Sequence, residues 1–409
     1  MTSKCRHCGS ALELSICNLG TSPLANSLVE PSQTSAAEKY YPLELLFCSN
    51  CLLVQLDAFE SPGAIFSHYS YFSSFSDTWV AHARRYVGKI CSEFNFDNRS
   101  QVIEIASNDG YLLKEFVRRK IPALGIEPAA NVAKVAQEAG VPTLNKFFGS
   151  TLARELLCQG LGADLIVANN VLAHVPDLND FVGGFKILLK PKGILTIEFP
   201  HLLRLMEGVQ FDTVYHEHFS YFSFLAAEKL MASHDLQIFD VERLQTHGGS
   251  LRLYVTHQEN ALPHGAGTGS LREEELRAGL LSINGYKDFP DRIRKVRRKL
   301  LRFLLDAQES GKTVVGYGAP AKAVTLLSYC GVGPDLLKFT VDTSPHKQGR
   351  LLPGSRLPIC HPNRIREVKP DYIVIFPWNI RDEIIGQLSD ARSWGCNFVV
   401  PIPEFEIIP

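Results

Sequence analysis

A short segment near the middle of the chain holds the densest set of groups that could move protons. Residues 211–222 contain two histidines, a glutamate and two tyrosines, in Tyr215-His216-Glu217-His218 and Tyr221. Either histidine is a candidate general base, because imidazole titrates near neutral pH. Glu217 could orient an imidazole, and a tyrosine hydroxyl could donate a hydrogen bond to a developing oxyanion. On a helix, residues two apart point to different sides, so only one histidine is expected to face a given site; the competing interpretation is ordinary packing.

Three other segments could contribute to the same chemistry. His174 follows a predicted strand at 164–168, where substrate would meet cofactor, although a residue that begins a helix is an equal alternative. Residues 68–72 form an aromatic run. Residues 247–252, His-Gly-Gly-Ser-Leu-Arg, are typical of a close backbone approach before a strand.

Four cysteines have the spacing of a metal site. Cys5 and Cys8 form one CxxC pair, Cys48 and Cys51 form another, and 39 residues separate the pairs. Two such turns supply the tetrahedral sulfur set that zinc prefers and leave no open position for catalysis. The surrounding segment is too short to fold alone, so zinc would supply folding energy. We expect a structural zinc site; the alternatives are a redox pair or unligated thiols, and Cys17 is expected in the core.

The elements that must position these groups alternate between strand and helix from residue 101 onward. Strands are expected at 101–105, 123–126, 164–168 and 193–199, and helices at 111–118, 129–139 and 178–189. This alternation predicts an α/β fold with a doubly wound parallel sheet, whose ligand site lies at the carboxyl ends of the strands.

The loops at those strand ends favour a nucleoside without a pyrophosphate. The turn after the first strand contains Asn-Asp-Gly but no GxGxxG, and Glu127 ends the second strand, where it could accept hydrogen bonds from a ribose diol. S-adenosylmethionine (SAM) has an adenosine, a ribose diol and a charged methionine end, and therefore fits better than NAD. The candidate cofactor residues are Glu104, Ala106, Asn108, Gly110, Glu127, Asn169 and Asn170.

A second glycine turn, near the C-terminus, supports an alternative function. Gly316, Gly318 and Ala321 fit GxGxxA after a strand, and Asp342 ends the next strand, which together form a dinucleotide fingerprint. This pattern would suit an NAD-dependent oxidoreductase of a nucleotide sugar. Lys322 follows at a helix N-terminus and would suit the diphosphate of a nucleotide sugar equally well.

Length and composition set the broad class of the protein. The 409 residues exceed the ~250–300 at which one core stops growing, so two or three domains are expected. A net charge of −1 without basic runs disfavours nucleic acid as a partner. We expect no signal peptide and no membrane span. The cysteines cluster in CxxC pairs, which favours metal binding in a reducing compartment over disulfide bonds, so we expect a cytoplasmic location. A monomer is expected.

In combination, the motifs resemble the SAM-dependent sugar C-methyltransferases that act on nucleotide-linked keto-deoxysugars. The resemblance rests on the two CxxC pairs and on residues 102–112, 215–222, 247–252, 317–322, 341–350 and 352–354. It implies three parts: a small N-terminal zinc-binding module over 1–65, a SAM methyltransferase domain over 66–260, and a Rossmann-like domain that binds the nucleotide sugar over 261–409.

The resemblance also implies roles for single residues. His218 would remove a proton from the sugar carbon beside a ketone, and the resulting enolate would attack the SAM methyl group, with C-3 of a 4-keto-6-deoxy sugar as the expected position. Tyr215, Glu217 and His174 would support it, and Tyr69 or Tyr71 would close the site. The expected substrate-binding residues are Tyr71, Tyr221, Tyr317, Lys322 and Arg350, and the expected nucleotide is dTDP rather than GDP.

Overall fold

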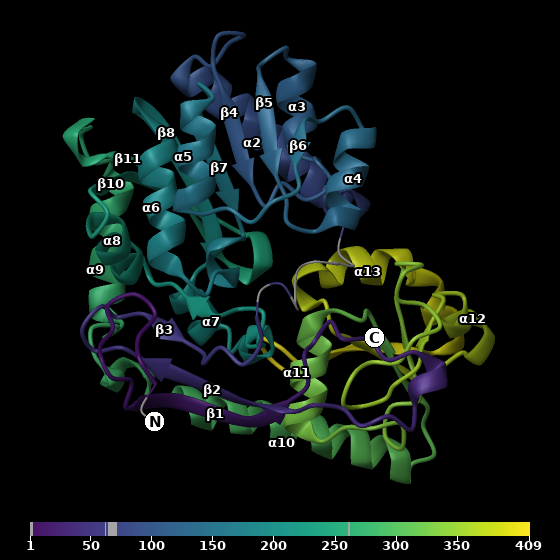
Figure 1. The fold of residues 1–409 in the computed structure, drawn as a ribbon. Helices are drawn as coiled ribbons and strands as arrows, with labels where there is room; N and C mark the ends of the chain where they lie inside the picture. Colours follow the sequence, from purple (N-terminus) through teal and green to yellow (C-terminus); the bar gives the residue numbers. More distant parts are fainter. Residues whose placement is uncertain (1–2, 62, 64–71, 261) are drawn as a thin grey trace.

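Three β-sheets organise the chain in the computed structural model, which describes residues 3–61, 63, 72–260 and 262–409 (Figure 1). The N-terminal sheet is antiparallel, in the order β1 (Leu14–Ser22), β2 (Tyr41–Phe47), β3 (Val54–Gln55) and β9 (Ser220–Tyr221). Its last strand lies within the predicted catalytic segment 211–222, two residues after His218. Backbone hydrogen bonds therefore connect the N-terminal module directly to the central domain.

The central sheet has seven strands. Their order is β10 (Leu236–Leu244), β11 (Ser250–His257), β8 (Leu189–Pro200), β7 (Ala163–Asn169), β4 (Val102–Ile105), β5 (Ala123–Ile126) and β6 (Thr143–Leu144). Neighbours from β8 to β6 are parallel, whereas β11 is antiparallel to both β8 and β10. All four residues of β4 are buried, as expected for a strand covered on both faces.

Helices cover both faces of this sheet. One hydrophobic core lies under α2 (Asp77–Phe94), α3 (Leu113–Arg118) and α4 (Ala130–Glu138), and the other lies under α5 (Ser150–Cys158), α6 (Leu178–Leu188), α8 (Phe224–Ala232) and α9 (Ala266–Arg277). The short helix α7 (Leu202–Glu207) follows β8. Side-chain caps define the starts of α2 and α6. The Ser76 side chain accepts a hydrogen bond from the main-chain nitrogen of Trp79, and the Asp177 side chain accepts one from the main-chain nitrogen of Asp180. The doubly wound α/β prediction is confirmed.

The C-terminal domain is built around a six-stranded sheet. Its order is β14 (Ile359–Cys360), β13 (Thr340–Val341), β12 (Val314–Tyr317), β15 (Tyr372–Ile375), β16 (Asn397–Val400) and β17 (Glu406–Ile408), and neighbours are parallel except for β16 with β17. Its helices are α10 (Phe289–Glu309), α11 (Ala321–Cys330), α12 (Arg364–Val368) and α13 (Arg381–Gln387).

The N-terminal sheet also packs on the C-terminal domain. Figure 1 shows β1 and β2 running alongside α10 and α11. Helix α10 buries Ile293, Val296, Leu300 and Leu304, spaced three and four residues apart, in a core shared with Leu45 of β2. The first part of the chain thus joins the other two. Among the described residues, no helix has both the length and the apolar character needed to cross a membrane.

Candidate active site

A cavity of about 800 Å³ lies between the central and C-terminal domains, at the carboxyl ends of β4, β5 and β7. All three parts of the chain contribute to its lining. The polar and charged lining residues include Asn26, Asn108, Glu127, Asn169, Asn170, His174, Tyr215, His218, Tyr221, His247, Lys322 and Lys347. The fold therefore brings the predicted cofactor loops, the predicted base and the C-terminal lysine to one place, as expected for strand ends in a doubly wound sheet.

Glu127 shapes the part of the cavity that the sequence predicts for adenosine. Its buried carboxylate accepts hydrogen bonds from the main-chain nitrogens of Asn108 and Ala129, each at 2.9 Å, and burial raises its pKa. Ala106 and Asn108 adopt positive φ angles of 55° and 51°, which turns the chain back over the strand end. Each carboxylate oxygen keeps acceptor capacity for a ribose hydroxyl. This arrangement fits the nucleoside of SAM.

Asn169 and Asn170 offer polar atoms to a ligand. The amide oxygen of Asn169, and both the oxygen and the nitrogen of the Asn170 amide, are buried without a hydrogen-bond partner among the described residues. Both side chains line the cavity. Buried polar groups are costly unless they are paired, so these atoms fit a ligand with polar groups of its own, as SAM has.

Two predicted cofactor residues, Glu104 and Gly110, lie next to the cavity but do not line it. Glu104 is fully buried and does not line the cavity, and burial raises its pKa well above the ordinary value. Gly110 has a φ of 75°, and an added Cβ would lie 2.9 Å from the Val141 side chain. Gly110 thus allows close packing of the turn and does not itself line the cavity.

His218 and His174 form a pair of imidazoles with ring centroids 4.7 Å apart and an interplanar angle of 68°. Nδ1 of His218 donates to the main-chain oxygen of Thr213 at 3.0 Å, and Nδ1 of His174 donates to that of Glu217 at 2.8 Å. Because a carbonyl oxygen can only accept, each hydrogen is assigned to Nδ1 and each Nε2 is the basic nitrogen. The Tyr215 hydroxyl lies 2.9 Å from Nε2 of His218.

Burial keeps both imidazoles neutral. It lowers the pKa of His174 to about 4 and that of His218 well below its ordinary value, and the neighbouring His174 adds to the second effect. His216 faces away, donating from Nε2 to the main-chain oxygen of Pro42 at 3.0 Å. The prediction that only one histidine of the tetrapeptide faces the site therefore agrees with the structure.

Glu217 acts on the pair differently from the sequence interpretation. Its main-chain oxygen, rather than its carboxylate, holds His174. The carboxylate is buried and accepts from Nδ2 of Asn26 at 2.7 and 2.8 Å, and burial raises its pKa to about 7. Asn26 lies in a loop of the N-terminal module, 191 positions away, where no sequence motif marks it.

Two lysines line the cavity from the C-terminal domain. Nζ of Lys322 donates to Oδ1 of Asn379 at 2.8 Å and lies 4.1 Å from the ring centroid of Trp378. Burial lowers the pKa of Lys322 to about 8. Lys347, which the sequence did not single out, donates to the main-chain oxygen of Ala319 at 3.0 Å. Two ammonium groups on one side of a cavity favour an anionic ligand group.

Two other predicted substrate residues, Tyr317 and Arg350, do not contribute to this lining. Tyr317 is buried in the core of the C-terminal sheet and donates to Gln387 at 3.2 Å. Arg350 pairs with Glu30 near the surface at 2.8 Å. The physical reason is the strand alternation on β12, which turns Tyr317 into the core while residues 320–322 of the following turn reach the cavity. Tyr69 and Tyr71 lie outside the described residues.

The predicted close approach at residues 247–252 is present. His247 lines the cavity with a φ of 53°, and its ring centroid lies 5.2 Å from that of Trp79, another lining residue that the sequence did not reveal. A Cβ on Gly248 would lie 2.5 Å from the Trp378 ring. Only glycine fits there, so the turn packs tightly on the C-terminal domain.

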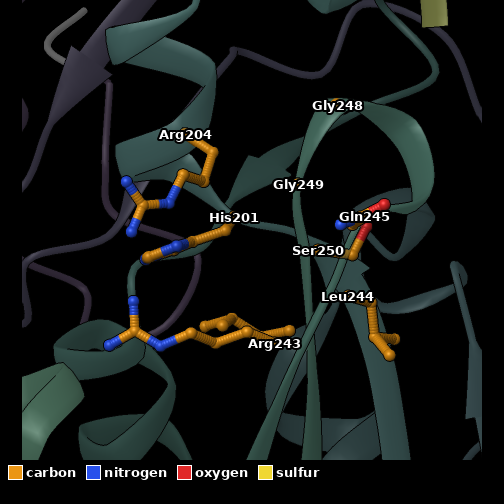
Figure 2. Close-up of a pocket in the computed structure, with 9 residues that line it drawn as sticks. His201, Arg204, Arg243, Leu244, Gln245, Gly248, Gly249 and Ser250 are labelled. Atoms are coloured by element: carbon orange, nitrogen blue, oxygen red, sulfur yellow. The ribbon is translucent and has the colours of Figure 1, made fainter.

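A smaller cavity of about 350 Å³ lies on the other side of this turn (Figure 2). Figure 2 shows Arg204 and Arg243 extending to the same side, with His201 between them. Both arginines form ion pairs with Glu274, and His201 pairs with the buried Glu275. These contacts are made within the protein and hold α9 against α7 and β10.

The four predicted zinc ligands come together in the N-terminal module. The Sγ atoms of Cys5, Cys8, Cys48 and Cys51 lie within 4.8 Å of one another. Four sulfurs in one cluster fit tetrahedral zinc, and Nε2 of Gln55 donates to Sγ of Cys5 at 3.2 Å, as expected for a hydrogen bond to a ligand thiolate. These residues would hold a structural zinc ion.

Family models match all three parts of the chain. A zinc binding domain matches residues 5–66, a methyltransferase domain matches 79–241, and a C-methyltransferase C-terminal domain matches 245–403. The ubiquinone biosynthesis O-methyltransferase of Bartonella tribocorum is 30% identical over 132 residues, which cover 30% of this chain and 52% of that protein.

Solved structures resemble part of the chain. Magnesium protoporphyrin IX methyltransferase of Synechocystis PCC 6803, with bound SAM, matches with a TM-score of 0.34 and 15% identity, over 44% of this chain and 82% of that one. The 1,6-didemethyltoxoflavin-N1-methyltransferase of Burkholderia thailandensis matches with a TM-score of 0.36 and 16% identity, over 50% and 94%. Scores this low do not bear on function.

One relative matches nearly the whole chain. C-methyltransferase NovU of Streptomyces niveus is 34% identical over 405 residues, which cover 99% of this chain and 96% of that protein. The expected enzyme class, the methyltransferase domain and the zinc-binding module are thereby confirmed. The chain belongs to the family of SAM-dependent C-methyltransferases.

Proposed function

We propose that the protein methylates the carbon beside the ketone of a nucleotide-linked 4-keto-6-deoxy sugar, at C-3, with dTDP as the nucleotide. The observation that carries this proposal is a neutral histidine pair in a cavity lined on one side by the predicted SAM loops and on the other by two lysines. A carbon becomes a nucleophile only after a proton is removed, so the reaction needs a base, an oxyanion donor and an anchor for the substrate.

His218 is the proposed base. With its hydrogen held on Nδ1 by the Thr213 carbonyl, Nε2 takes the proton from the sugar carbon and becomes cationic. The electron pair of the broken C–H bond moves onto the ketone oxygen. The Tyr215 hydroxyl lies 2.9 Å from Nε2 of His218 and is the proposed hydrogen-bond donor to the ketone oxygen.

The residues at the strand ends hold the methyl donor. SAM would supply a methyl group on a positively charged sulfur. As the enolate carbon bonds to that methyl group, the sulfur–methyl bond would break and the sulfur would leave as a neutral thioether, so no metal ion is needed. Glu127 binds the ribose diol, and Asn169 and Asn170 pair with polar groups of the same ligand. Both substrates are thus held in one cavity, which lowers the entropic cost of their reaction.

The C-terminal domain anchors the nucleotide. Lys322 and Lys347 face the cavity and suit a diphosphate, which carries two or more negative charges near neutral pH. The alternative is an NAD-dependent oxidoreductase that uses the GxGxxA turn. Against it, Asp342 does not line the cavity, and its carboxylate is paired with Nζ of Lys347 at 3.6 Å in addition to accepting from the nitrogens of Ala319 and Ser344, both at 2.8 Å. Calorimetry that detects NAD binding but no SAM binding would restore the alternative.

Deuterium exchange tests the proposal directly. A dTDP-4-keto-6-deoxy sugar incubated with the enzyme in deuterated water should gain deuterium at C-3 even without SAM, and should gain a methyl group there when SAM is added. His218→Asn should abolish both reactions. His216→Asn is the matched control, because the neighbouring imidazole faces Pro42 and should leave both rates near wild type. Exchange that persists in His218→Asn would assign the base elsewhere, with His174 as the next candidate.

A further inference from the structure

We propose that Arg6, which lies between the first two zinc-ligand cysteines, is a positioning residue for the histidine pair His174 and His218. The inference rests on the proposed function for the role of that pair. It extends the task of the zinc-binding module beyond its own folding, since the arginine reaches from the Cys5–Cys8 turn to the loops that carry both imidazoles.

The guanidinium of Arg6 contacts both loops. Nη1 donates to the main-chain oxygen of Pro176 at 3.3 Å, two residues after His174. Nη2 donates to the main-chain oxygen of Leu56. The central carbon lies 5.4 Å from the ring centroid of Phe219, the residue that follows the proposed base. One planar, rigid group therefore spans the segments on which the two histidines sit.

Main-chain hydrogen bonds join the same segments beneath the guanidinium. The nitrogen of Phe219 donates to the oxygen of Ala173 at 2.7 Å, and the nitrogen of Leu56 donates to the oxygen of Phe219 at 3.0 Å. His174 in turn donates to the main-chain oxygen of Glu217. The spacing of the histidine pair is thus set by the same three segments that Arg6 contacts.

The zinc site holds Arg6 in place. The main-chain nitrogen of Arg6 donates to Oε1 of Gln55 at 3.0 Å, and Nε2 of the same glutamine donates to Sγ of Cys5 at 3.2 Å. Gln55 is only 1% exposed and lies in β3, which pairs with β9 two residues after His218. The next residue, His7, accepts at its main-chain oxygen from Nδ2 of Asn179 at 2.8 Å, near the start of α6. The fixed conformation of the Cys5–Cys8 turn therefore directs the Arg6 side chain toward the loops that carry His174 and His218.

The test compares Arg6→Gln and Arg6→Lys with Ser49→Ala in the full-length, zinc-loaded enzyme. Ser49 follows Cys48 as Arg6 follows Cys5, but its side chain is exposed, which makes it a matched control. All three variants should keep their zinc, by metal analysis, and wild-type affinity for SAM. Arg6→Gln should lower kcat about tenfold to a hundredfold without raising the KM of the keto sugar. Arg6→Lys keeps the charge but loses the planar fork, so its kcat should be intermediate.

A histidine-detected NMR titration tests the inference without substrate. In Arg6→Gln, water that enters around the loosened pair should move the pKa of His174 from about 4 toward the ordinary value of about 6.5, while Ser49→Ala should titrate as wild type. Wild-type kcat with an unchanged titration in Arg6→Gln overturns the inference, as does a loss of kcat that only follows a loss of zinc. A wild-type enzyme that neither exchanges nor methylates the keto sugar refutes the proposed function instead, and the titration still decides the role of Arg6.

Discussion

Asp212 and Trp378 share a buried hydrogen bond across the interface between the central and C-terminal domains. Nε1 of Trp378 donates to Oδ2 of Asp212 at 2.7 Å, and burial raises the pKa of Asp212 to about 6. The same indole ring lies beneath the ammonium group of Lys322 and against the Gly248 turn. This pair therefore connects the segment that precedes the proposed base with the proposed nucleotide anchor.

Trp378→Phe should weaken the interface in a pH-dependent manner. The variant leaves a buried carboxylate without its donor, which costs about 1–3 kcal/mol of unfolding free energy. Loss of the donor raises the pKa of Asp212 further, so the deficit should be larger at pH 8, where the carboxyl is ionised, than at pH 5. Urea unfolding at the two pH values measures this. Trp394→Phe, which removes a half-buried bond to the Pro370 oxygen, should show a deficit that does not change with pH.

The Glu217 carboxyl should make the wild-type protein less stable as pH rises from about 4.5 to about 7. Its folded pKa of about 7 lies above the ordinary value of 4.5, so the native state holds more protons than the unfolded state in that range. The full effect is about 3–4 kcal/mol, because each pH unit between the two pKa values is worth about 1.4 kcal/mol. Glu217→Gln should remove this contribution from the pH dependence of urea unfolding, whereas Glu13→Gln, at an exposed position, should retain it. Equal slopes in both variants would contradict the prediction.

Lys322→Gln should raise the KM of the nucleotide sugar about tenfold to a hundredfold, since a hydrogen bond to a charged group contributes about 1.5–3 kcal/mol. The KM of SAM should stay the same. In the wild type, the KM of the sugar should rise as pH passes about 8, where burial places the pKa of Lys322 and the ammonium charge is lost. Steady-state kinetics checks both statements. Lys338→Gln is the control because that lysine is exposed on the same domain. An equal rise in the KM of the nucleotide sugar for Lys338→Gln would contradict a specific role for Lys322.

Cys51→Ser should lose zinc and lower the thermal unfolding midpoint together with activity. Metal loss frees the turn that Gln55 connects to β3, and β3 pairs directly with β9 beside the catalytic segment. Metal analysis and thermal unfolding monitored by circular dichroism measure the two losses. Cys158→Ser, at an exposed cysteine, should change neither. A zinc-free Cys51→Ser protein with wild-type stability would show that the metal has no structural role.

The sequence by itself determines the groups that act over short stretches of chain. Paired CxxC spacings identify the zinc ligands, and the alternation of strands and helices predicts the sheet that carries Glu127 and Asn169 at the carboxyl ends of its strands. Such features follow from covalent spacing and backbone periodicity, which are visible without a fold.

Only the tertiary structure decides which distant segments complete the site. It places Asn26 against Glu217 and Arg6 against the histidine loops, and it turns Tyr317 and Arg350 away from the cavity. None of these residues stands in a motif that reveals its contact, because each interaction joins elements that approach only when three separate cores have packed. The proton-handling segment from residue 211 to 222 can therefore be recognised in the sequence. The burial that keeps its imidazoles neutral arises only when the separate parts of the chain pack together.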